Sequence, residues 1–234
     1  MNKKATHNIE LNFYYLHSND AEKFALWAKR EEEQKSKLKS IHARHAILSA
    51  VFTCESLINL VLADFYIPKS GSDSIERLSL YDKWIIAPLI CTNNQRMTTF
   101  DKSADPFQSF AELIKIRNWL VHPKPDTYVD GALDEDSTIT DIEAKTEYTW
   151  VDIIKGKIWP QTKIPVNPFE LCSKHADKAI CIAKAMEIKL KELMPNQITD
   201  DWLNRIKCKD KKTGSTKNIT IDSLWGGYTP YEDR

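Results

Sequence analysis

Apolar and polar residues alternate with a helical period over much of the chain. Between Asn19 and Ile67 there is no glycine or proline, which predicts helix throughout. The first half is charged and is predicted to be a solvated helix with Asn19 or Asp20 as its N-cap. In the second half, apolar residues recur three or four apart and predict a buried face: Ala43, Ile47, Ala50, Cys54, Leu57, Val61 and Phe65. We expect a bend or short turn near Ser40 between the halves; one continuous helix is the alternative.

A second long helix is predicted by agreeing start and stop signals. Asp105 is placed as the N-cap, Pro106 at the first helical position and Gln108 three residues after the cap. Pro123 disfavours helical geometry at the residue before it, so this helix is predicted to end at His122.

A third long helix is predicted from Asn167, the N-cap, to Pro195, which stops it. Pro168 at the first helical position and Glu170 in a capping box support this start. The apolar residues then step by four and three, as in the seam of a helical bundle: Cys172, Ala176, Ala179, Ala183, Met186, Leu190 and Leu193.

The remaining segments are shorter and less regular. Residues 74–90 predict one or two short helices ended by Pro88. An insertion is predicted at 123–166, in which alternating apolar positions around 155–157 are compatible with a small β-hairpin. After residue 195, a short helix at 200–206 is predicted, followed by a mobile lysine-rich stretch and an aromatic tail.

These elements predict an all-α fold, an antiparallel bundle of the four-helix type with an irregular insertion. The helical domain is expected to cover residues 1–195, with the insertion 123–166 inside it. Residues 196–234 are expected to form a C-terminal extension.

Composition narrows the classes of function. The 33 basic residues balance the 33 acidic ones, so nucleic acid would have to bind at a local basic site. The five cysteines form no CxxC pair, and we interpret them as reduced and structural. Because no run of about 18 apolar residues occurs, we expect a cytoplasmic protein without a membrane span.

The candidate chemistry lies in the stretch KIRNWLVHPKP, residues 115–125. On a helix, Asn118 and His122 share a face, and Arg117 is long enough to reach the same terminal turn. Histidine can exchange a proton near neutral pH, and arginine binds phosphate through a fixed fork of donors. The trio is therefore suited to cleaving RNA, whose 2′-hydroxyl is an internal nucleophile. The spacing alone is common by chance, and a histidine at a helix C-terminus also has an ordinary capping role.

The residues Arg117-Asn118-Trp119-Leu120-Val121-His122 resemble the R-x4-6-H motif of the HEPN superfamily, including the polar residue after the arginine. The resemblance implies catalytic roles for Arg117 and His122 and a supporting role for Asn118. It also implies a homodimer with facing motifs, and a metal-independent endoribonuclease without a cofactor that acts as a toxin or defence effector. An antitoxin protein is a further expected partner. The acidic residues of 126–143 depart from this picture, because carboxylates beside an RNA cleft repel phosphate.

Further residues are weaker candidates. Glu55, within an apolar stretch, is expected either to pair with Arg117 or to face solvent or a dimer seam. The basic residues that could contact RNA phosphates are Lys115, Lys124, Lys207, Lys209, Lys211 and Lys212, with Trp202 or Trp225 as a surface for stacking bases.

Two other readings of the sequence stay open. In the first, the bundle is a catalytically silent module that dimerises or binds a nucleotide or a protein, and the motif only caps a helix. In the second, His42 and His45 begin the metal site of a hydrolase, although no third ligand follows from local spacing. His175 is interpreted as a surface histidine, and Asp134 with its acidic neighbours as a solvated loop.

Overall fold

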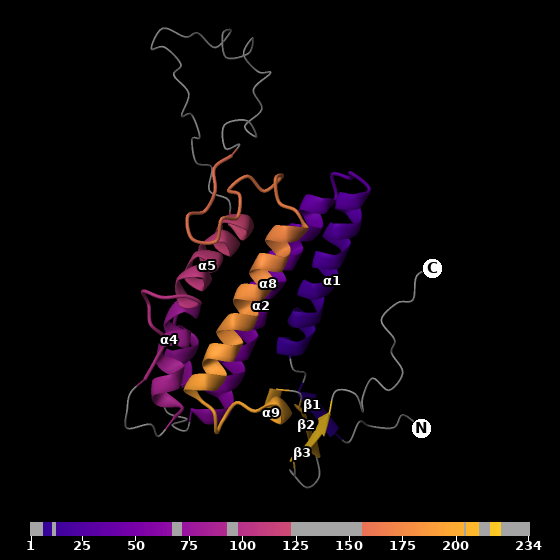
Figure 1. The fold of residues 1–234 in the computed structure, drawn as a ribbon. Helices are drawn as coiled ribbons and strands as arrows, with labels where there is room; N and C mark the ends of the chain where they lie inside the picture. The colour runs from indigo at the N-terminus through magenta and orange to yellow at the C-terminus, as the bar shows by residue number, and fades with distance from the viewer. Residues whose placement is uncertain are drawn as a thin grey trace, which may run out of the picture.

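The computed structural model describes residues 7–10, 13–66, 72–92, 98–122, 156–203, 205–210 and 216–220. In this part the chain is mostly helical, as predicted. Figure 1 shows α8 in front of α2, with α1 on one side and α4 and α5 on the other. The elements are β1 (His7–Glu10), α1 (Phe13–Glu33), α2 (Lys39–Phe65), α3 (Ser72–Glu76), α4 (Leu80–Ile90), α5 (Phe107–Val121), α8 (Ser173–Leu193), α9 (Asp200–Leu203), β2 (Arg205–Asp210) and β3 (Thr216–Thr220).

Helices α1 and α2 form a hairpin whose turn lies at residues 34–38, so the predicted break near Ser40 is confirmed. The predicted N-cap at Asn19 or Asp20 is wrong, because α1 already begins at Phe13. Helix α1 is also less solvated than predicted. It buries alanines at positions 21, 25 and 28, and these small side chains let it approach α2 closely.

Helix α2 lies at the centre of the bundle and contacts α1, α4, α5 and α8. Of the core positions predicted on this helix, Phe65 is partly buried and all the others are fully buried. By length and composition α2 is the one described helix that could cross a membrane, but 61% of its most apolar window is buried inside the protein. Its apolar character is therefore explained by its central place in the bundle.

Between α4 and α5 the core is aromatic. The ring of Trp84 is fully buried and meets the rings of Phe100 and Phe110 edge-on at centroid distances of 5.5 and 5.4 Å. Pro88 does not end α4, contrary to prediction, and lies inside the helix. The hydroxyls of Thr92 and Thr99 donate to the carbonyls of Pro88 and Ile85, which stabilises the backbone around the proline.

The predicted starts of α5 and α8 need correction. Helix α5 begins at Phe107, and Pro106 rather than Asp105 is the N-cap residue. Asp105 still bonds the first turn, since its carboxylate accepts from the backbone N–H and the hydroxyl of Ser109. Helix α8 begins six residues after Asn167, with Cys172 as its N-cap. The signals at Asn167 instead form a local turn, in which its Oδ1 accepts from the Phe169 N–H at 3.0 Å.

Two carboxylates tie the segment before α8 to α5, and the first residue of α8 to α1. Glu112 of α5 is buried and accepts backbone N–H groups of Gln161 and Thr162. Glu32 of α1 accepts the hydroxyl of Ser173 at 2.7 Å, and this hydrogen bond lowers the pKa of Glu32. The predicted β-hairpin around 155–157 lies largely outside the described residues. The described end of the insertion contains one isolated bridge, between Ile158 and Pro165.

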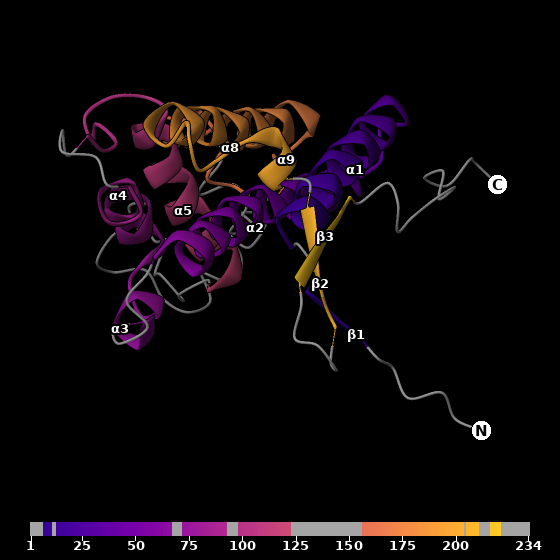
Figure 2. The ribbon, with the colours of Figure 1, turned by 90° about the horizontal axis from the view of Figure 1, so that it is seen from below.

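A small sheet joins the two ends of the chain and was not predicted. Its three strands are antiparallel in the order β1-β2-β3, with Ile9 opposite Cys208 and Ile206 opposite Ile219. Residues 205–210 are thus a strand, not the end of a helix or a mobile stretch. The sheet lies beside α9, at the end of the bundle where α1 begins (Figure 1, Figure 2).

The C-terminal extension begins inside the core rather than beside it. Ile198, Trp202 and Leu203 are buried with the residues of the bundle. The indole N–H of Trp202 donates to Asp64 of α2 at 2.9 Å. Trp202 is therefore a core residue and offers no exposed ring for stacking a base.

His175 is buried in the capping box of α8, so its interpretation as a surface residue is wrong. Its Nδ1 accepts the backbone N–H of Cys172 at 3.1 Å, which requires the neutral imidazole. Burial, aided by the charge of Lys174, lowers the pKa of His175 from 6.5 to about 4.

This lowered pKa predicts that the protein loses stability in mild acid. The unfolded chain binds the proton more readily, so the contribution is complete above pH 6.5 and is lost as the pH falls to about 4. We expect a loss on the order of 2 to 3 kcal/mol across this window in urea denaturation. His175→Gln keeps an acceptor for the capping box but does not titrate, and should flatten that part of the pH profile. An unchanged profile in the variant would contradict this origin.

Candidate functional site

Arg117 lies in the last turns of α5 and is held from two sides. Its Nη2 donates to Oε2 of Glu55 on α2 at 3.1 Å, and its Nη1 donates to Oδ1 of Asn118 at 3.0 Å. The guanidinium carbon also lies 5.8 Å from the centroid of the Phe52 ring. Of the two alternatives predicted for Glu55, the structure therefore shows the pairing with Arg117, and the guanidinium has a defined position.

His122 is the C-cap residue of α5, as its place before Pro123 predicted. Its backbone N–H donates to the carbonyl of Asn118 at 2.8 Å, and its side chain is exposed. Within the described residues no hydrogen bond reaches the imidazole. The structure thus brings Glu55, Arg117 and Asn118 together and leaves the His122 ring open to solvent at the end of the same helix.

A second histidine lies near this site and was missed in the sequence. His17 of α1 lies 5.6 Å from the Phe52 ring, the same ring that Arg117 contacts, and 6.1 Å from the ring of Phe13. The signal was the four-residue spacing of Phe13 and His17, which places both on one helix face. A helix that begins at Asn19, as the sequence predicts, leaves both residues outside it, so this face is seen only because α1 begins at Phe13.

The charges around Arg117 largely compensate one another. The side chain of Arg117 is 19% exposed and that of its partner Glu55 is 36% exposed. An RNA phosphate would therefore meet a neutral pair, with exposed Lys115 on the same helix as an added cation. Lys124, Lys211 and Lys212 lie outside the described residues, as do Trp225 and Asp134, and the side chains of Lys207 and Lys209 are not described.

The other candidate chemistries find less support among the described residues. Burial raises the pKa of Cys54 and Cys172, and raises that of Cys91 to about 11, so these thiols are poor nucleophiles. His42 and His45 pack against the ring of Phe24. No group of three metal-ligating side chains occurs in the described part of the chain.

The ion pair between Arg117 and Glu55 should be measurable as a coupling free energy. Because both side chains are partly buried, a double-mutant cycle with Glu55→Gln and Arg117→Met, which removes one charge in each step, should give about 1 kcal/mol in urea denaturation. The corresponding cycle with Lys184→Met and Glu22→Gln, whose wild-type side chains are more than half exposed, should give less than half of this coupling free energy. Additive effects at Glu55 and Arg117 would show that the contact does not hold the guanidinium in solution.

The site assembled from the described residues therefore consists of an anchored guanidinium, an amide that bonds it, and an exposed imidazole one helical turn further on. In this arrangement the guanidinium can bind an anion and the imidazole can accept a proton. The sequence matches no protein-family model, and comparison with curated proteins and with solved structures found no match.

Proposed function

We propose that the protein is a metal-independent endoribonuclease that cleaves single-stranded RNA, with Arg117 and His122 as its catalytic residues. The observation that carries the proposal is the fixed position of Arg117 at the end of α5, between Glu55 and Asn118. A guanidinium that is oriented before the substrate binds can stabilise charge on a phosphate without reorganising. The resemblance of residues 117–122 to the R-x4-6-H motif of HEPN proteins supports the same assignment.

In the proposed reaction, the imidazole of His122 accepts the proton of the ribose 2′-hydroxyl. The 2′-oxygen attacks the adjacent phosphorus, and the bond from phosphorus to the 5′-oxygen breaks. The products are a 2′,3′-cyclic phosphate and a 5′-hydroxyl, whose proton comes from water or from a second imidazole. Arg117 stabilises the negative charge that develops on the phosphoryl oxygens, while Asn118 and Glu55 hold Arg117 in place.

The proposal includes a homodimer in which two copies of the motif face one another. Exposed apolar residues beside the site support an interface there: Phe13, whose ring stacks on His17, is 54% exposed, and Val121, next to His122, is 42% exposed. As a cytoplasmic toxin or defence effector, such a nuclease would be restrained by an antitoxin protein. Light scattering of the purified protein measures its oligomeric state directly. A protein that is monomeric and still cleaves RNA would contradict the dimer.

The test of the activity uses RNA and EDTA. The purified protein should cleave single-stranded RNA with EDTA present and leave 2′,3′-cyclic phosphate ends. A substrate with 2′-deoxyribose at the cleaved position should resist, because it lacks the nucleophile. Cleavage that needs a divalent cation, or that leaves 3′-hydroxyl ends, would contradict the proposed chemistry.

A catalytically silent interaction module is the second candidate function. One observation favours it: both terminal nitrogens of Arg117 are already bonded to Glu55 and Asn118, and its Nε is buried without a partner among the described residues. In this case Arg117→Ala lowers the melting temperature or the dimer affinity, and no RNA turnover exists to be lost. Thermal unfolding and RNA cleavage of one protein sample therefore separate the two functions.

A further inference from the structure

A pocket of about 360 Å³ opens between α2, α3 and α4, one helical turn along α2 from Glu55. Its volume lies within the range of roughly 300–1,000 Å³ that is usual for small-molecule sites. Asn59 and Leu62 line it from α2, Ile75 and Glu76 from α3, and Lys83 from α4. None of these residues takes part in the proposed cleavage of RNA.

Lys83 is the unusual residue of this pocket. Lys83 is only 8% exposed, and a lysine is rarely buried without an anionic partner. The ammonium donates one hydrogen bond, to Oδ1 of Asn59 at 2.9 Å, and this partner is neutral. No described carboxylate lies within ion-pair distance of it. Two N–H donors and one positive charge are thus left for a ligand.

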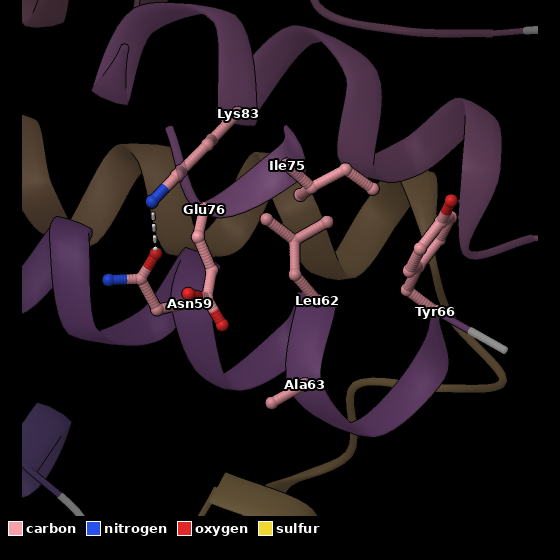
Figure 3. A pocket seen from close by; sticks show the side chains of 7 residues that line it. All are labelled: Asn59, Leu62, Ala63, Tyr66, Ile75, Glu76 and Lys83. Carbon is pink, nitrogen blue, oxygen red and sulfur yellow. Dashed lines mark hydrogen bonds between the residues drawn. The ribbon is translucent and has the colours of Figure 1, made fainter. Parts of the chain in front are cut away.

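The lining of the pocket is divided into a polar and an apolar end, as Figure 3 shows. Lys83, Asn59 and Glu76 gather at one end, so a cation, an amide and a carboxylate lie close together. The side chains of Leu62 and Ile75 lie in the middle, and the ring of Tyr66 lies at the other end.

We propose that this pocket binds a small zwitterion with an apolar body, of the class of the apolar α-amino acids. The ligand carboxylate accepts hydrogen bonds from the Lys83 ammonium. The ligand ammonium pairs with the carboxylate of Glu76. The apolar side chain of the ligand is covered by Leu62, Ile75 and Tyr66.

The charges of the pocket favour this class over a simple anion. Lys83 and Glu76 together are neutral, so a phosphate dianion would meet repulsion from Glu76 as well as attraction to Lys83. A ligand with one charge of each sign satisfies both groups. The apolar end adds affinity only for a ligand that has a body to bury there.

Binding to the full-length protein is tested by calorimetry with five probes. L-phenylalanine and L-leucine should bind at millimolar concentrations or below, each raising the melting temperature. Phenethylamine, which lacks the carboxylate, should bind at least tenfold more weakly than L-phenylalanine. The affinity of 3-phenylpropionate, which lacks the ammonium, should lie between those of L-phenylalanine and phenethylamine. Failure of both amino acids to bind, or equal binding by phenethylamine, overturns the proposal. So does inorganic phosphate binding as tightly as L-phenylalanine.

Two variants locate the bound ligand. Lys83→Met keeps the length of the side chain and removes a buried charge. It should weaken the binding of L-phenylalanine at least tenfold. Lys178→Met, at an exposed position of α8, is the matched control and should bind as the wild type does. Unchanged affinity in Lys83→Met overturns the site. If Lys83→Met does not fold, Glu76→Gln provides the test, because it should remove the preference for L-phenylalanine over 3-phenylpropionate. A retained preference would overturn the proposed site.

Discussion

His122→Ala should reduce the rate of RNA cleavage by about 10²- to 10⁴-fold, the usual contribution of one general base. The side chain is exposed at the end of α5 and no described residue bonds its ring, so its removal should leave the fold intact. Circular dichroism and melting temperature should therefore match those of the wild type. The measurement is the initial rate on a labelled single-stranded RNA in EDTA.

The matched control for this loss is His17→Ala. The ring of His17 contacts the ring of Phe52, and the guanidinium of Arg117 lies over that same ring, so His17 is a second histidine close to the site. The variant should retain cleavage within about threefold, since His17 has no role in the proposed proton transfer. If His17→Ala lost activity while His122→Ala kept it, the base would be His17 and the assignment from the sequence would be wrong.

Trp84→Ala should lower the free energy of unfolding by about 3–5 kcal/mol, the largest effect on stability that we expect. The indole is fully buried against the rings of Phe100 and Phe110, so alanine leaves a cavity between α4 and α5. Because its Nε1 has no partner among the described residues, Trp84→Phe loses no hydrogen bond there and should cost less than half as much. Urea denaturation of the three proteins gives both values.

Trp27→Ala is the control for the size of the residue removed. Trp27 is 42% exposed on α1, so its removal should cost less than about 1.5 kcal/mol. Equal losses for Trp84→Ala and Trp27→Ala would contradict the buried aromatic cluster between α4 and α5.

The helices were predictable where the apolar period was long and unbroken. The seam of α8 and the buried face of α2 needed nothing beyond spacing, because a helix central to a bundle must bury one continuous stripe. The contact between Glu55 and Arg117 was also predictable as one of two outcomes, since a carboxylate within an apolar stretch needs a partner.

The errors came from local signals that the surrounding structure overrides. Asn167 and Asp105 both bond nearby backbone groups, as capping residues do, yet the helices begin later, at Ser173 and Phe107. Pro88 was read as a stop, although the hydroxyls of two threonines stabilise the helix around it.

Pairing across a long sequence distance was the other feature that local reading could not supply. The sheet joins β1, at the start of the chain, to β2, almost 200 residues later, and no short-range pattern encodes such a partner. The contacts of the pocket and of the site depend in the same way on which helices meet: Lys83 of α4 reaches Asn59 of α2, and Arg117 of α5 reaches Glu55 of α2, only in the folded chain.

The most direct test of the central claim asks whether an RNA phosphate lies between Arg117 and His122. A 2′-deoxy oligonucleotide cannot be cleaved, so it can be titrated into protein with ¹⁵N-labelled histidine rings and followed by NMR. We predict that the His122 ring resonances shift on binding, and that Arg117→Lys weakens this binding at least tenfold. A bound oligonucleotide that leaves the His122 ring unchanged, or one that Arg117→Lys binds equally well, would contradict the proposed site.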